Sequence, residues 1–118
     1  MQGNHIVYSF HIPGTLAANV VITFIAPQAL QLVHISAGGS NANDGLLIVG
    51  PSTDTDGYLE SASIGDSGTP VTFDKDDFVG TQPVHIAAGT KIVATLDYDG
   101  AGGTATDDFT LVLTFTEG

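Results

Sequence analysis

Strict alternation of apolar and polar side chains constrains this chain more than any other feature of its sequence. In two long stretches every second residue is apolar: Ile6, Tyr8, Phe10 and Ile12, and later Phe109, Leu111, Leu113 and Phe115. Successive side chains of an extended strand point to opposite faces, so each of these sets covers one face of a strand. The pattern predicts β-strands that bury one face.

Breaks rich in glycine and proline separate about eight such stretches, and no segment has the period of an amphipathic helix. Antiparallel strands need only short connections, whereas a parallel sheet needs crossover helices. We therefore predict an all-β fold, an eight-stranded antiparallel β-sandwich, with the jelly roll as its topology. An immunoglobulin-like sandwich is the alternative, although the chain has neither the cysteine pair nor the tryptophan of antibody domains.

The length of 118 residues fits one domain, and a hydrophobic share of 42% is enough for its core. We predict a single β-sandwich domain over residues 1–118. The first ten residues, "MQGNHIVYSF", lack the basic segment and long apolar run of a secretory signal. No apolar run approaches the roughly 20 residues that span a bilayer. We expect a soluble protein without a signal peptide or a membrane partner.

The charge of the chain is lopsided: thirteen Asp and Glu face two Lys and no Arg, for a formal net charge of −11. Phosphate backbones are bound by clustered Lys and Arg, so the composition argues against nucleic acid as a partner. Most carboxylates have no lysine to pair with. They must be solvated, hydrogen-bonded, or neutralised by cations or a basic partner.

The stretch "PSTDTDGYLES", residues 51–61, places Asp54, Asp56 and Glu60 around a glycine. Calcium takes six to eight oxygen ligands, so these three carboxylates are the candidate metal ligands of the chain. Their spacing does not fit an EF-hand, and Asp-Gly between two strands is also a common turn signal. A calcium site and a solvated turn are both open here, and the pairs at 97 and 99 and at 107 and 108 pose the same choice.

No pattern in the sequence indicates an enzyme. The chain lacks the G-x-S-x-G nucleophile elbow, its acidic pairs lie in polar turns rather than a cleft, and no glycine-rich loop leads into a helix that would hold phosphate. A carbohydrate-binding module is an alternative, because small β-sandwiches bind sugars on exposed aromatic rings. The candidate ligand contacts are Tyr58 and Tyr98, which both lie beside acidic turns.

Four stretches in order, "FHIPGTL", "FIAPQALQLVHISA", "LLIVGPSTDTDGYL" and "AGTKIVATLDYDG", resemble small jelly-roll structural proteins of tailed bacteriophages. The likeness is to head decoration, or cement, proteins. It implies a homotrimer on the outer capsid surface of the virion that binds the viral major capsid protein and stabilises the assembled shell. No catalytic or ligand residue is carried over from it. The alternative function is a carbohydrate-binding or calcium-dependent ligand-binding β-sandwich module.

Overall fold

The alternating stretches form strands in the structure, a computed structural model that describes residues 5–65 and 69–118. The strands are β1 (His5–Thr15), β2 (Val20–Ile25), β3 (Leu30–Gly38), β4 (Leu46–Pro51), β5 (Leu59–Ser63), β6 (Val71–Phe73), β7 (Val84–Ile86), β8 (Lys91–Asp97) and β9 (Asp107–Glu117). Within the described ranges, no helix is long and apolar enough to cross a membrane.

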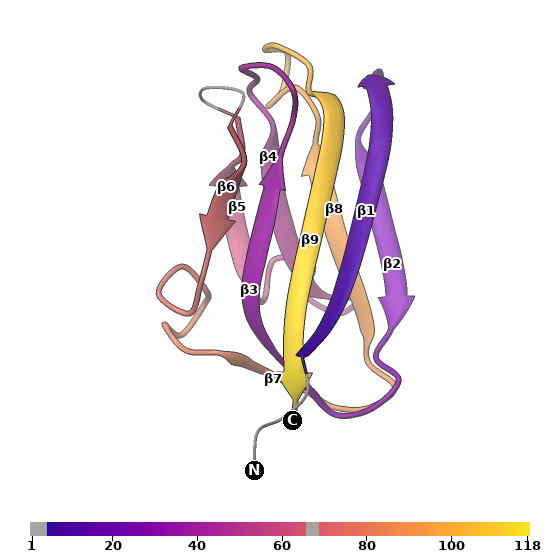
Figure 1. Ribbon diagram of the computed structural model, residues 1–118, viewed down its shortest axis with the longest axis vertical. Helices are drawn as coiled ribbons and strands as arrows, with labels where there is room; N and C mark the ends of the chain where they lie inside the picture. The colour runs from indigo at the N-terminus through magenta and orange to yellow at the C-terminus, as the bar shows by residue number, and fades with distance from the viewer. Residues whose placement is uncertain (1–4, 66–68) are drawn as a thin grey trace.

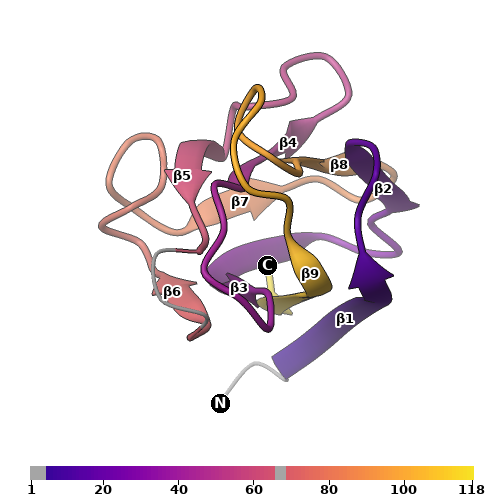
Figure 2. The same cartoon turned by 90° about the horizontal axis from the view of Figure 1, so that it is seen from above.

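The strands form two antiparallel sheets that pack face to face (Figure 1). One sheet has the order β1, β9, β3, β6, with β7 also paired to β3. The other has the order β2, β8, β4, β5. The strands β1 and β2 therefore end their sheets on the same side of the sandwich, and β5 and β6 end them on the opposite side, as Figure 2 shows from above.

The hydrogen-bonded strand pairs are nested around the β4–β5 connection. The strand β4 pairs with β5, β3 with β6 and β7, β2 with β8, and β1 with β9. The chain is thus one long hairpin folded over so that its strands alternate between two sheets, which is the jelly-roll connectivity. The predicted jelly roll is confirmed. In the immunoglobulin-like alternative the first strand pairs with the second, and here it pairs with the last.

One of the eight strand positions is divided between two short strands. The strands β6 and β7 both pair with β3, β6 opposite Ile35–Ala37 and β7 opposite Leu30–Leu32. Residues 74–83 leave the sheet between them, and Phe78 anchors this excursion because its side chain is buried. The eight-stranded sandwich of the prediction is therefore present as nine strand segments.

The core lies between the two sheets and contains the alternating side chains that the sequence places on one face. The largest fully buried side chains are Phe109, Phe115, Leu30, Leu32, Ile35, Leu47, Leu59, Ile64, Ile92, Leu96, Leu111 and Leu113. All four apolar residues predicted to line one face of β9 are among them. The corresponding residues of β1, from Ile6 to Ile12, also face the core but stay only half-buried, because β1 is an edge strand.

Antiparallel pairing gathers the connections at two ends of the sandwich. The upper end in Figure 1 carries residues 16–19, 39–45 and 98–106. The lower end carries residues 51–58, which we call the lower loop. The backbone N–H of Ser52 in this loop donates to the carbonyl of Lys91, 3.0 Å away, which ties the loop to the start of β8.

Candidate functional site

The lower loop is closed by its own backbone hydrogen bonds. The N–H of Asp54 donates to the carbonyl of Pro51 at 3.0 Å, and the N–H of Gly57 donates to the carbonyl of Asp54 at 2.8 Å. These two consecutive turns fold the loop back over Gly50, where a side chain would collide with the Asp54 carbonyl. The glycine at position 50 is therefore needed for the close approach of two backbone segments.

Asp54 and Asp56 of this loop and Glu60 of β5 lie near one another. The pKa of Asp54 is raised, first by a hydrogen bond with the Asp56 side chain, then by burial and by the charges of Asp56 and Glu60. A hydrogen bond between two carboxyls requires one of them to keep a proton, so the like charges are in conflict at neutral pH. A bound cation would relieve this conflict.

Calcium binding at the lower loop stays a prediction. Among residues 5–65 and 69–118, no three His, Asp or Glu side chains are arranged to hold a metal ion. One backbone acceptor that a cation would use, the carbonyl of Asp54, already accepts the N–H of Gly57. Side chains on an exposed loop can turn toward an added ion, and a titration decides whether they do.

The two candidate tyrosines differ in exposure. Tyr58 is only 8% exposed, because the lower loop brings it back onto β4, where its N–H donates to the Val49 carbonyl. Burial raises the pKa of its hydroxyl and leaves almost no ring surface for a ligand. Tyr98 is half-buried at the upper end, and the pKa of its hydroxyl is raised mainly by the charge of Asp99. Ligand contact at either residue stays a prediction.

At the upper end, Asp108 is hydrogen-bonded by a backbone amide and a hydroxyl. Asp108 accepts the N–H of Gly14 and the hydroxyl of Ser40, each at 2.7 Å. These hydrogen bonds to its charged form, that of Gly14 above all, lower the pKa of Asp108. The residue has a φ of 51°, a left-handed conformation that aspartate tolerates better than most residues. One carboxylate thus joins β1, the β3–β4 connection and β9.

Two further carboxylates at this end also bind backbone amides. The pKa of Asp99 is lowered, first by the N–H of Gly102, and also by that of Ala101, which donates to Oδ1 at 3.1 Å. Asp44 Oδ2 accepts the N–H of Thr104 at 2.6 Å. Folding does bring the predicted acidic pairs at 97 and 99 and at 107 and 108 to one end of the molecule. Their hydrogen bonds there are structural.

A buried polar pair that the sequence does not reveal holds the upper end together. Asn43 is 5% exposed, and its Oδ1 accepts the N–H of Gly45 at 2.9 Å and the hydroxyl of Thr106 at 3.1 Å. Its Nδ2 donates to the Asn41 carbonyl at 3.1 Å. A shallow polar pocket of about 190 Å³ lies beside Asn43. Asn43, which lines this pocket, makes these hydrogen bonds within the protein.

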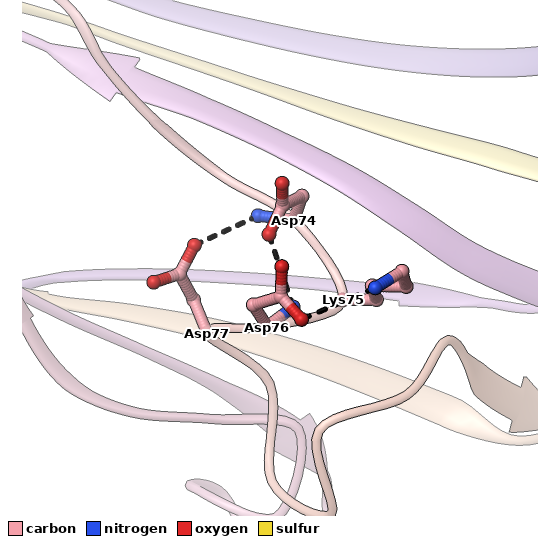
Figure 3. Close-up of polar contacts among 4 residues, drawn as sticks. All are labelled: Asp74, Lys75, Asp76 and Asp77. Atoms are coloured by element: carbon pink, nitrogen blue, oxygen red, sulfur yellow. Dashed lines mark hydrogen bonds and ion pairs between the residues drawn. The ribbon is translucent and has the colours of Figure 1, made fainter.

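A third cluster of acidic residues, Asp74, Asp76 and Asp77, lies in the excursion between β6 and β7, as Figure 3 shows. The N–H of Asp74 donates to Asp77 Oδ2, and the N–H of Asp76 donates to Asp74 Oδ1, each at 3.0 Å. Lys75 Nζ pairs with Asp76 Oδ1 at 3.1 Å on the exposed surface. These contacts are those of a tight polar turn, and exposed ion pairs of this kind add little stability.

The side of the sandwich formed by β1 and β2 is apolar, which the sequence analysis did not predict. Val7, Val21 and Ile25 on these strands are 57%, 63% and 53% exposed. A signal for this side exists in the sequence, because the first 43 residues contain no Asp, Glu, Lys or Arg. The described residues thus combine structural acidic turns with one side whose strands contain no Asp, Glu, Lys or Arg.

Two solved structures of phage capsids contain chains with a similar fold. The match to a chain of the cyanophage Pam1 capsid asymmetric unit has a TM-score of 0.60 and 16% sequence identity, and covers 99% of this chain and 87% of that chain. The match to a chain of the capsid of Ralstonia phage GP4 has a TM-score of 0.62 and 18% identity, and covers 100% and 87%. At these identities the likeness is one of fold. No protein-family model matches the sequence, and no curated protein matches it significantly.

Proposed function

We propose that this chain is a non-enzymatic structural protein of a phage virion, a decoration or cement protein that binds the assembled shell. The observation that carries the proposal is the jelly roll itself, which aligns over nearly its whole length with chains of two phage capsid structures. The strand order of the chain supports the same conclusion. Likeness of fold alone does not determine function, so the proposal needs its own test.

In the proposed role, the chain forms a homotrimer on the outer capsid surface and binds the major capsid protein. Its mechanism is linkage: a ligand that binds the assembled shell but not its separate subunits stabilises the shell by mass action. At a free concentration one hundred times Kd, the stabilisation is about 2.7 kcal/mol for each site. A rigid sandwich suits this role, because ordering its loops on binding costs little free energy.

The upper end offers one surface for such contacts, because its loops are fixed by hydrogen bonds such as those of Asp108 and Asn43. The chain has a formal charge of −11, so a basic patch on the shell would attract it over roughly one Debye length of about 8 Å in physiological salt. Association driven in this way weakens as salt is added.

Cosedimentation with capsids tests the proposal. Capsids of the phage that encodes the chain, purified from a strain in which this gene is deleted, are mixed with the purified protein at rising concentration. We expect saturable binding to capsids, no binding to dissociated major capsid protein, and a higher temperature of capsid disruption. The proposal is wrong if the protein stays in the supernatant, or if it binds separate subunits as tightly as shells.

A glycan array run on the same preparation tests the alternative function, a carbohydrate-binding module. Specific sugar binding that Tyr98→Ala abolishes, together with no capsid binding, would establish a carbohydrate-binding module instead. Because Tyr98 lies at the upper end and is half-buried, the Ala variant must first be shown to unfold at the same denaturant concentration as the wild type.

A further inference from the structure

The two sides of the sandwich end in very different edge strands. The strand β1 has 11 residues, and its register against β9 is unbroken from His5 to Ile12. On the opposite side, β5 has five residues and carries Glu60, and β6 has only three. Natural sheets protect their edges with short strands, charges and bulges, because a long free edge pairs with other strands. The β5–β6 side is protected in this way, whereas β1 has a proline, Pro13, and a register break only beyond Ile12, which leaves the stretch from His5 to Ile12 unprotected.

The β1–β2 side is also the most apolar exposed part of the described surface. Among the described residues, four large hydrophobic side chains are substantially exposed. Three of them, Val7, Val21 and Ile25, lie on β1 and β2. Between the two strands, Tyr8 and Phe24 stack with ring centroids 4.6 Å apart and remain only partly buried. An apolar band therefore runs across this side from one outer face to the other.

The β1–β2 side also differs from the rest of the molecule in its content of charged residues. Every charged side chain of the sequence, thirteen carboxylates and two lysines, comes after residue 43. Charged groups border β1 and β2 at their ends, such as Lys91, opposite Ile25 on the neighbouring strand, and Asp108, which is bound to Gly14 at the upper end of β1. A charged partner finds no countercharge on this band. Two copies of an acidic chain, however, approach each other with least repulsion through a surface that has no carboxylates.

We propose that the β1–β2 side is the surface through which copies of this chain bind one another. This inference rests on the proposed function, since it names the contact that builds the trimer, in which the β1 edge of one copy meets the β2 edge of the next around a three-fold axis. A copy seated here covers Val7, Val21 and Ile25 and supplies partners to the free backbone groups of β1. Interfaces between copies of one chain are more apolar than those with transient partners, which matches the composition of this band. The acidic loops stay free for the shell.

The test is the mass of the free protein in solution, measured by light scattering behind a sizing column. The double variant Val7→Glu/Val21→Glu adds two carboxylates to exposed positions of the band. The control is Val79→Glu, at a valine that is 44% exposed outside the band. We expect the wild type and the control to have three times the 12.1 kDa chain mass and the double variant to have the mass of one chain.

Circular dichroism and thermal unfolding establish that each variant folds, and hydrogen exchange gives a readout that needs no variant. In the wild type, amides of β1 should exchange at least tenfold more slowly at high protein concentration than at a dilution that separates the copies. A monomeric wild type, a trimeric double variant, dissociation of the Val79→Glu control, or β1 exchange that does not depend on concentration would each overturn the inference. Capsid cosedimentation reports on the proposed function separately, because mass is measured without capsids.

Discussion

At the upper end of the sandwich the Asp108 carboxylate accepts hydrogen bonds from a backbone amide and a serine hydroxyl, whereas at the lower end the Asp54 carboxyl faces other carboxylates. Asp108 binds Gly14 and Ser40, and its pKa is lowered. Asp54 lies beside Asp56 and Glu60, and its pKa is raised. The same residue type therefore stabilises one end of the molecule and strains the other. What differs is whether a backbone N–H or another carboxylate points at the side chain.

The difference follows from how each end is built. At the upper end the register of β1 against β9 breaks between Ile12 and Thr15, and a long connection, residues 98–106, joins β8 to β9. The amides of Gly14 and Thr104 in these two places donate to carboxylates instead of to a neighbouring strand. In the lower loop, the amides of Asp54, Gly57 and Tyr58 donate to backbone carbonyls, so little remains for its side chains to accept. Acidic residues there are consequently free to bind something else.

The largest effect should come from removing the buried amide at the upper end. Asn43→Ala leaves the N–H of Gly45 without an acceptor and opens a hole beside Thr106. Because a buried unsatisfied polar group costs about 1 to 3 kcal/mol, we expect the free energy of unfolding to fall by roughly 2 to 4 kcal/mol in urea titrations.

A substitution in the lower loop serves as the control for Asn43→Ala. The side chain of Ser52 is exposed, and the backbone hydrogen bond from its N–H to Lys91 is kept in Ser52→Ala. This variant should stay within about 0.5 kcal/mol of the wild type. A loss below 0.5 kcal/mol for Asn43→Ala would show that the upper end does not depend on the buried amide.

Neutralising one carboxylate at each end of the sandwich should change the free energy of unfolding by a smaller amount, with opposite sign at the two ends. At pH 7 Asp108→Asn should lower the free energy of unfolding, because it weakens the hydrogen bonds of Gly14 and Ser40, while Asp54→Asn should raise it by removing a repelled charge. Asparagine also tolerates the left-handed backbone of residue 108, so the first substitution changes mainly the charge.

Acid titration of the same two variants distinguishes the loss of hydrogen bonds at Asp108 from the loss of charge repulsion at Asp54. The pKa of Asp108 is lowered in the folded state, so its contribution is full above the unfolded value of about 3.9 and fades as pH falls through its lower folded pKa. The pKa of Asp54 is raised, so the wild type gains stability as pH falls through that folded value toward the unfolded one. The advantage of Asp54→Asn should therefore vanish in acid. Equal pH profiles for the two variants would contradict the assignment.

The smallest effect should come from calcium at the lower loop. An ion that binds Asp54, Asp56 and Glu60 relieves their repulsion, and at a calcium concentration equal to Kd the folded state gains about 0.4 kcal/mol. Isothermal titration calorimetry should show heat of binding for the wild type and none for Asp54→Asn/Asp56→Asn. Binding that persists in this variant but is lost in Asp99→Asn would move the cation site to the upper end.

The fold was largely predictable, because its main signal is local. Alternation over a few residues places Ile6 and Phe109 on inward faces without any knowledge of their partners. The strand order is not local, since it depends on contacts such as that of Ile12 with Phe109. A single jelly-roll strand divided into β6 and β7 is also invisible in sequence, because three-residue strands are defined by the pairing of β3 and not by their own pattern.

The candidate site was less predictable for the same reason. Tyr58 follows an acidic turn, which suggests an exposed ring, yet the loop folds back and buries it. The role of Asp108 depends on Gly14, which is 94 positions away in the chain. The apolar band on β1 and β2 was accessible in principle, because the absence of charge before residue 44 can be read directly from the sequence. Alternation alone does not show which strands end the sheets.

The nested strand pairs have a consequence for how the chain folds. The β4–β5 hairpin joins neighbours in sequence, while β1 pairs with β9, at the other end of the 118 residues. Loop closure over such separations makes folding slow, on a scale of roughly milliseconds to seconds. During synthesis β1 leaves the ribosome first and waits for β9, which leaves last. The strand that stays unpaired longest thus contains no Asp, Glu, Lys or Arg.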